Sequence, residues 1–327
     1  MIDISGFGAA SGICGGFFMF RFFRDSMRAM LVRPNARRRA LLKGAGALAA
    51  AAATPVFGAR RLFRAVGITA RIERAAELES HGADFIVESV ADFLIPFAGD
   101  AEFDANRRRA LAAPLRIRGC NSFLRDPSLV CVGPNADHPR VLGYANTAFA
   151  RLRSLGGEYI VFGSNSARRI PEGWSKSQAD EQFIALLKAM APLARTHRIT
   201  IGVEMQRSQE CNYLNHIEEV VNVVAPVNHR HVRVLADLYH MRVMGDSPAQ
   251  LAKAMPWVGL VEMAELERRT LPGVAGDDFR PYLEVLARGG FSGLADIEGD
   301  GTPEQLRNAF RTVATQSADA VRASRRR

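Results

Sequence analysis

The run ITIGVE at residues 199–204 is a short β-rich stretch that ends in a carboxylate, Glu204, and VRVLAD at residues 232–237 repeats the arrangement with Asp237. Two later runs do the same, because VGLVE ends at Glu262 and GLADIE ends at Glu298. Apolar and β-branched residues in runs of this length predict buried strands. A buried carboxylate is costly unless a positive charge lies beside it. The four runs therefore predict strands whose acids share a cationic partner.

The strand-like runs extend on both sides of this region and alternate with amphipathic, helix-like segments. Eight such runs follow residue 60: Ala65–Thr69, Asp84–Ser89, Leu115–Cys120, Glu158–Phe162, Ile199–Glu204, Val232–Asp237, Val258–Met263 and Gly293–Glu298. Eight strand–helix repeats predict a (β/α)8 TIM barrel, an α/β fold of about 250 residues. We assign it to residues 60–327 as a single domain. A doubly wound sheet is the alternative, but the glycine-rich turn that it needs does not follow the first run.

The four acids stand at the carboxyl ends of their predicted strands, the face on which TIM barrels build their sites. Four carboxylates that converge there would suit a hard divalent cation, with Mg²⁺ or Mn²⁺ favoured. Polar residues follow in the next loops, among them Glu210, His240 and Arg268. Such side chains could bind the hydroxyl groups of a carbohydrate above the cation. Trp174 could cover the pocket or pack in the core.

The charge of the chain is concentrated at its beginning. The formal net charge is +9, but residues 1–59 hold eight of the basic and two of the acidic residues, which leaves 35 basic and 32 acidic residues beyond them. This small excess gives no argument for nucleic-acid binding. The run RRRALLK at residues 37–43, the alanine-rich stretch after it and the small residues at 58–59 predict a twin-arginine-type export signal. We therefore expect a periplasmic or exported protein without stable membrane insertion after signal removal.

A series of short motifs runs through the predicted barrel: HGADFIVE at 81–88, GCNSF at 119–123 with Asn121, VFGS at 161–164, ARRIPEG at 167–173, GVE at 202–204, ECN at 210–212, LADLYH at 235–240, AELERRTLPG at 264–273 and GLADIE at 293–298. Through these motifs the chain resembles, from about residue 64 to residue 300, the sugar isomerase/epimerase superfamily with a xylose isomerase-like barrel, which includes hydroxypyruvate isomerase-like and ketose 3-epimerase-like enzymes. The resemblance implies that Glu204 and Glu298 are both metal ligands and acid–base residues, and that Asp237 is a ligand.

The resemblance also implies substrate contacts from Glu210, His240 and Arg268, and we add Asn121 and Trp174 to this set. In one respect the sequence departs from the family pattern, which has a histidine ligand at the position of Glu262. A fourth carboxylate adds negative charge and favours Mg²⁺ or Mn²⁺ over softer ions. It also leaves open a change of reaction or a loss of catalysis.

The resemblance implies a metal-dependent isomerase or epimerase that moves a proton next to the carbonyl of a sugar through an enediolate. In this hypothesis Glu204 removes the proton on one face and Glu298 returns one on the other. A keto-sugar lyase on the same scaffold and a non-catalytic exported sugar-binding protein are the alternatives. An apurinic endonuclease would need a histidine-rich zinc site and a basic surface, which this sequence lacks. The sequence is also compatible with a homo-oligomer.

Overall fold

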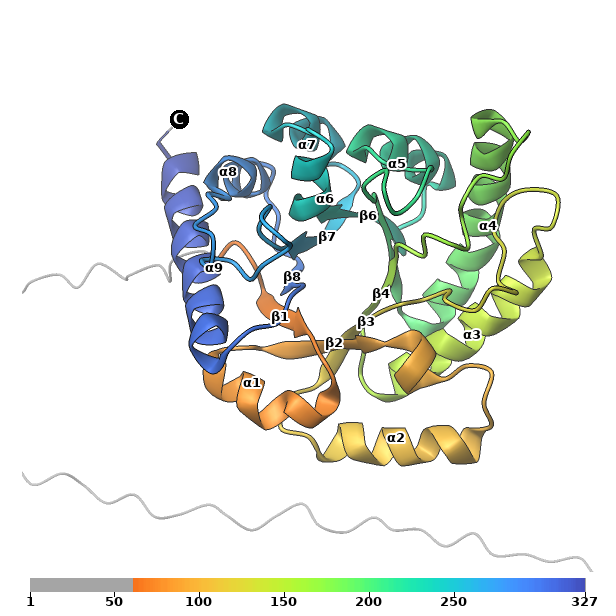
Figure 1. The fold of residues 1–327 in the computed structure, drawn as a ribbon, viewed down its shortest axis with the longest axis horizontal. Coiled ribbons are helices and arrows are strands. Elements are labelled where there is room, and N and C mark those ends of the chain that lie inside the picture. The colour runs from red at the N-terminus through yellow and green to blue at the C-terminus, as the bar shows by residue number, and fades with distance from the viewer. Residues whose placement is uncertain (1–60, 327) are drawn as a thin grey trace, which may run out of the picture. The chain divides into compact units, whose positions relative to one another are not determined.

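The computed structural model describes residues 61–326, which form a closed parallel barrel in the order β1 to β8, with β8 paired back to β1 (Figure 1). The predicted TIM barrel is thus confirmed. The strands are β1 Ala65–Thr69, β2 Phe85–Ser89, β3 Ile117–Asn121, β4 Tyr159–Phe162, β5 Thr200–Glu204, β6 Val232–Asp237, β7 Val258–Met263 and β8 Leu294–Ile297.

The helices surround the barrel and cover its outer surface (Figure 1). Short helical turns lie at Ile72–Arg74, Val90–Leu94 and Ala225–Val227. The α-helices are α1 Ala75–His81, α2 Asp100–Ala112, α3 His138–Ser154, α4 Lys176–His197, α5 Ile217–Val224, α6 Leu238–Val243, α7 Pro248–Ala254, α8 Arg280–Arg288 and α9 Pro303–Ser324.

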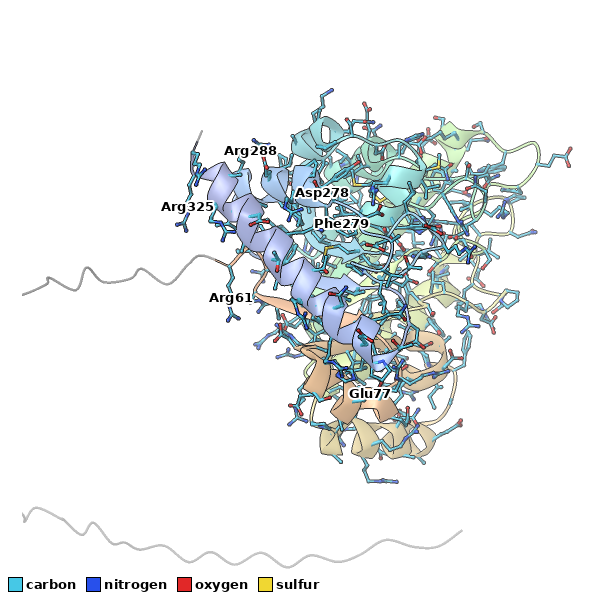
Figure 2. The ribbon with its side chains drawn as sticks, turned by 60° about the vertical axis from the view of Figure 1, so that its left-hand side comes forward. Arg61, Glu77, Asp278, Phe279, Arg288 and Arg325 are labelled. Atoms are coloured by element: carbon cyan, nitrogen blue, oxygen red, sulfur yellow. The ribbon has the colours of Figure 1, made fainter. Side chains whose placement is uncertain are left out.

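The last helices are tied to each other where α8 begins. Figure 2 shows Asp278 and Phe279 beside α9, which runs along the outer wall of the barrel toward Arg325. The backbone N–H of Phe279 donates to Gln316 Oε1 of α9 at 2.7 Å. This bond satisfies an N–H at the start of α8 that has no partner within the helix. It also fixes the end of the loop that leads from β7 to α8.

Inside the barrel, alternate residues of each strand fill the interior, as the pleat of a strand requires. A separate buried cluster of inward-facing residues forms the floor beneath the strand ends, made of Ala65, Phe85, Val87, Tyr159, Val161, Leu235, Leu260 and Leu294. Gly119 leaves room for the largest of these rings, because a Cβ atom at this position would lie 2.2 Å from Cζ of Tyr159. The next inward position toward the carboxyl end of several strands is polar, and this layer forms the site.

Three cysteines of the described residues, Cys120, Cys131 and Cys211, are buried free thiols. Among residues 61–326, no helix combines the length and the apolar character that crossing a membrane requires. The predicted export signal lies outside the described residues, so it stays a prediction.

Candidate active site

Strand register brings the acids side by side. Asp237 on β6 is the partner of Glu262 on β7, and Glu262 is in turn the partner of Asp296 on β8. Glu204 ends β5, and Glu298 follows the end of β8 on the same inward-facing row as Asp296. The parallel arrangement sends all of these side chains to one mouth of the barrel.

The structure brings together the four carboxylates singled out in the sequence. Glu204, Asp237, Glu262 and Glu298 each offer an oxygen, and these oxygens lie within 4.8 Å of one another. The side chains of the first three are at most 5% exposed, whereas that of Glu298 is 30% exposed. Glu298 is therefore the acid of the cluster that meets solvent at the mouth of the pocket.

Burial and mutual repulsion change the acidity of the cluster. Burial, with Asp237 and Glu298 nearby, raises the pKa of Glu204 well above its usual range. Burial and the carboxylates of Glu298 and Asp296 raise the pKa of Glu262 in the same direction. Without an added positive charge, burial and repulsion therefore favour the protonated forms of Glu204 and Glu262 more than in an isolated carboxyl group.

His240 is fully buried beside the same acids. Its Nε2 lies 3.6 Å from Glu204 Oε1, 3.6 Å from Asp237 Oδ2 and 3.9 Å from Glu210 Oε2. The backbone N–H of Arg207 donates to its Nδ1 at 3.2 Å, so the ring proton belongs on Nε2. Burial lowers the pKa of His240 although Asp237 opposes this. A neutral imidazole therefore directs an N–H toward the carboxylates.

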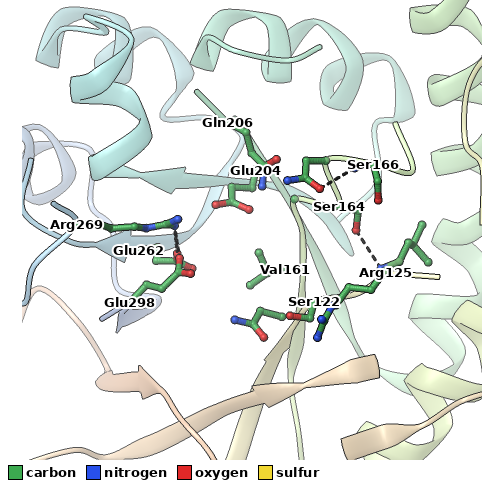
Figure 3. Close-up of a pocket in the computed structure, with 14 residues that line it drawn as sticks. Ser122, Arg125, Val161, Ser164, Ser166, Glu204, Gln206, Glu262, Arg269 and Glu298 are labelled. Carbon is green, nitrogen blue, oxygen red and sulfur yellow. Dashed lines mark hydrogen bonds and ion pairs between the residues drawn. The ribbon is translucent and has the colours of Figure 1, made fainter. Parts of the chain in front are cut away.

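A pocket of about 250 Å³ opens above the cluster (Figure 3). Its lining is mostly polar, with Asn121, Ser122, Ser164, Asn165, Ser166 and Gln206 facing Glu204, Glu262, Arg269 and Glu298. Gly163 also lines it, and a Cβ atom there would lie 2.2 Å from Glu204 Oε2. The absence of a side chain at Gly163 thus leaves space for the carboxylate of Glu204. Hydroxyl and amide groups around a small cavity suit a polyhydroxylated ligand.

Of the residues predicted to contact substrate, Asn121 lines the pocket, whereas Glu210, His240, Arg268 and Trp174 do not. Arg268 is exposed and lies outside the pocket lining, and its place is taken by Arg269, whose guanidinium forms an ion pair with Glu298. The reason is the backbone, since both arginines adopt left-handed conformations with φ of 54° and 55°, which carries the second arginine inward. Trp174 packs against the hydrophobic core and not into the pocket. Glu210 is partly buried and bound to Nε of Arg207 at 2.6 Å.

Asp296 is a further member of the site that the sequence reasoning missed. It is fully buried, and the hydroxyl of Tyr159 donates to its Oδ1 at 2.8 Å. Burial raises its pKa to about 7. The sequence spacing could have identified Asp296, because it precedes Glu298 by two residues and a strand places such positions on one face.

The donor atoms fit a divalent cation. All four groups are carboxylates, the ligands that hard cations prefer. Glu262 Oε1 is buried and accepts no hydrogen bond from any residue in the described part of the chain. A buried oxygen without a donor is destabilising unless a cation satisfies it. Glu204, Asp237, Glu262 and Glu298 are therefore able to hold such an ion.

Solved structures with the same fold include several sugar epimerases. D-psicose 3-epimerase from Clostridium cellulolyticum H10, solved with D-tagatose, is 19% identical and superposes with a TM-score of 0.63 over 80% of this chain and 98% of its own. The 3-keto-D-glucoside 4-epimerase YcjR from E. coli is 16% identical, with a TM-score of 0.60 over 80% and 99%. The IolI protein, solved with a zinc atom, is 19% identical, with a TM-score of 0.60 over 80% and 99%.

No curated protein sequence matches the chain. The sequence profile of the family described as Xylose isomerase-like TIM barrel matches residues 72–320, which is most of the barrel. The barrel topology, the polar layer at its mouth and this match agree, and the chain belongs to the xylose isomerase-like TIM barrel family.

Proposed function

We propose that the protein is a sugar isomerase or epimerase that depends on a divalent cation and moves a proton next to a carbonyl group. The observation that carries the proposal is the convergence of Glu204, Asp237, Glu262 and Glu298 beneath a polar pocket. The sugar epimerases that share the fold support a carbohydrate substrate, and the keto-glucoside enzyme among them supports keto-sugars as a class to test.

In the proposed reaction the chain supplies two acid–base groups from different sides of the pocket. Glu204 comes from β5 and Glu298 from the end of β8, so β6 and β7 separate them around the barrel. A bound divalent cation would polarise the substrate carbonyl and acidify the neighbouring C–H bond. The carboxylate of Glu204 accepts this proton and leaves an enediolate. Protonated Glu298 then delivers a proton to the opposite face, which gives the epimer.

Other side chains bind and orient the sugar. The amide of Asn121 lines the pocket and is suited to hydrogen bonds with substrate hydroxyls, whereas the buried His240 directs its Nε2–H toward the carboxylates beneath. After one turnover Glu204 holds the abstracted proton and Glu298 lacks one. Before the next turnover Glu204 releases its proton to solvent through the open pocket, and the more exposed Glu298 takes one up. If Glu204 returned the proton to the adjacent carbon, the outcome would be isomerisation. Mg²⁺ or Mn²⁺ is the proposed cofactor, because every ligand is a carboxylate.

The proposal is tested by incubation with ketoses and keto-glycosides in D₂O, with Mn²⁺ or Mg²⁺ present. Isomerisation or epimerisation should introduce deuterium at a substrate carbon, as measured by NMR and mass spectrometry. Glu204→Gln should reduce turnover by about 10²–10⁴-fold or more, the usual contribution of a general base. The exposed residue Glu267 gives the control, since Glu267→Gln should leave turnover unchanged.

Other outcomes separate the alternatives. An unsaturated sugar that forms with release of the leaving group would identify a lyase, which begins with the same proton abstraction. Sugar binding without deuterium incorporation would identify a binding protein. Full turnover by Glu204→Gln would remove Glu204 from the mechanism.

We further propose export by the twin-arginine pathway, on the basis of the paired arginines Arg38 and Arg39 ahead of the alanine-rich stretch. Replacement of both residues by lysine, Arg38→Lys with Arg39→Lys, keeps the positive charge and removes the arginine pair. Cell fractionation should then find the variant retained in the cytoplasm and the unmodified protein exported. Equal export of both proteins would contradict this route.

A further inference from the structure

The guanidinium of Arg269 lies among the carboxylates that are proposed to hold the metal (Figure 3). Its Nη2 donates to Glu298 Oε2, and it lies 3.4 Å from Asp237 Oδ2 and 3.6 Å from Glu262 Oε1. One nitrogen thus contacts three of the four acids. A single charged group between three carboxylates is in the position that a metal ion would take.

The backbone holds Arg269 in this place. Arg268 and Arg269 form the tip of a tight turn that is closed by the N–H of Glu265, which donates to the carbonyl of Thr270 at 2.8 Å. The Thr270 hydroxyl donates back to Glu265 Oε2 at 3.2 Å. The guanidinium also lies over the ring of Tyr239, with Cζ 4.9 Å from the ring centroid. The inward direction of Arg269 is therefore built into the loop.

A divalent ion and this guanidinium compete for the same carboxylate groups. Asp237 Oδ2, Glu262 Oε1 and Glu298 Oε2 face Arg269, and oxygens of these residues also belong to the four-carboxylate cluster. Two cations that approach one set of ligands repel each other strongly in a buried site. Glu262 adds a fourth carboxylate to the cluster, and its negative charge attracts Arg269 as well as a metal.

We infer that Arg269 is an internal competitor of the divalent cation, which stabilises the metal-free site and withdraws when the ion binds. The inference rests on the proposed cation site. The apparent affinity for the ion is then lower than the intrinsic affinity by the fraction of molecules in which Arg269 has withdrawn. Removal of the guanidinium should tighten binding of the ion, whereas loss of an ordinary structural arginine would weaken it or leave it unchanged.

The test is a titration of the metal-free protein with Mn²⁺, in which the free hydrated ion is measured by electron paramagnetic resonance. Arg269→Met removes the charge and keeps a long apolar chain against Tyr239. We expect its dissociation constant for Mn²⁺ to be at least about tenfold lower than that of the unmodified protein. Arg268→Met is the matched control, because Arg268 has the same left-handed backbone but is exposed, and its dissociation constant should not change.

Thermal unfolding gives a second readout that is independent of activity. Without metal, Arg269→Met should unfold at a lower temperature than the unmodified protein, because its carboxylates lack a counter-ion. Saturating Mn²⁺ should raise the unfolding temperature of Arg269→Met more than that of the unmodified protein. Should Arg269→Met not fold, Arg269→Lys keeps the charge on a shorter chain and should bind Mn²⁺ more tightly than the unmodified protein.

The possible results separate this inference from the proposed function. Equal or weaker Mn²⁺ binding by both Arg269 variants would overturn the inference and leave the metal site in place. If neither the unmodified protein nor any variant binds Mn²⁺, both the inference and the cation dependence of the proposed function fail. If only the Arg269 variants bind Mn²⁺, Arg269 excludes the ion completely from the unmodified protein, which supports the inference.

Discussion

At the scale of single residues, Asp296 and Glu262 form the deepest layer of the site. Both side chains are almost completely buried, and Tyr159 donates to Asp296 from below. Two neighbouring carboxyl groups at this depth cannot both be charged at low cost. The folded chain therefore binds protons here that the unfolded chain releases.

The first prediction concerns the pH dependence of stability. Because the pKa of Asp296 rises from 3.8 to about 7 on folding, its cost to stability is absent below pH 3.8 and grows as the pH rises toward 7. In the metal-free protein, Asp296→Asn should therefore gain stability relative to the unmodified protein as the pH rises. The gain is at most about 4 kcal/mol. Urea unfolding in the presence of a chelator, at several pH values across this range, measures it.

Asp300 provides a control, because its effect on stability should change with pH in the opposite direction. Its hydrogen bond with Arg74 lowers its pKa, so it stabilises the folded chain above its unfolded pKa. Asp300→Asn should lose stability relative to the unmodified protein as the pH rises through the acidic range. If the difference in unfolding free energy between Asp296→Asn and the unmodified protein were the same at every pH, a raised pKa of Asp296 in the folded chain would be contradicted.

The residues differ in how far the sequence could place them. Glu204, Asp237 and Glu262 could be placed because each is the inward-facing acid near the end of a regular strand, where the period of two is fixed. Arg269 could not, because its direction depends on two consecutive left-handed residues that no strand or helix pattern encodes. The backbone therefore places Arg269 in the pocket lining at the position next to the predicted Arg268.

At the scale of elements, the loop from β7 to α8 is organised around one buried carboxylate. Oε1 of Glu265 accepts backbone N–H groups from Gly273 at 2.6 Å, Gly276 at 3.1 Å and Asp277 at 3.0 Å, and Oε2 accepts that of Ala275. Glu265 itself is fully buried. The loop thus wraps around the carboxylate of Glu265, whose oxygens accept hydrogen bonds from backbone N–H groups of the loop.

The second prediction concerns this loop. Glu265→Gln replaces an acceptor by an amide whose N–H₂ group faces backbone donors, so it should lower the free energy of unfolding by roughly 2–4 kcal/mol. Amide hydrogen exchange should also accelerate at residues 266–278 more than elsewhere. Glu267→Gln, two residues later and exposed, should change neither quantity. Equal protection of the loop in both variants would show that Glu265 does not organise it.

The strands were more accessible to sequence reasoning than this loop. Each predicted strand overlaps an observed one, because apolar, β-rich runs mark the strands. The carboxyl-terminal ends of β1, β2, β4, β5, β6 and β7 coincide with their predicted ends. The loop instead depends on hydrogen bonds between Glu265 and residues up to twelve positions later. Such contacts follow from the folded chain and have no periodic signature.

At the scale of the whole molecule, the described barrel is closed and contains its own core. Strands β1 to β8 pair only with one another among residues 61–326, and the first of them begins at Ala65. The family profile likewise lies within this part of the chain. The domain predicted for residues 60–327 should therefore fold without the segment before it.

The third prediction tests this independence. A chain without residues 1–59 should show the far-ultraviolet circular dichroism of a TIM barrel and a single cooperative unfolding transition. Its unfolding temperature should match that of the full chain. Its Mn²⁺ affinity should be the same, since the four carboxylates all come from β5 to β8 and the residue after it. A molten or aggregated product would show that the preceding segment is needed for folding.

Closure of the barrel by its last strand also has a consequence for biosynthesis. Leu294 of β8 pairs with both Ala65 of β1 and Leu260 of β7, and Glu298 emerges directly after this strand. A growing polypeptide that has not yet reached β8 therefore has an open ring and an incomplete set of acids. The proposed cation site is therefore complete only once β8 has been synthesised, and under the proposed export route the ion would be bound before the protein leaves the cytoplasm.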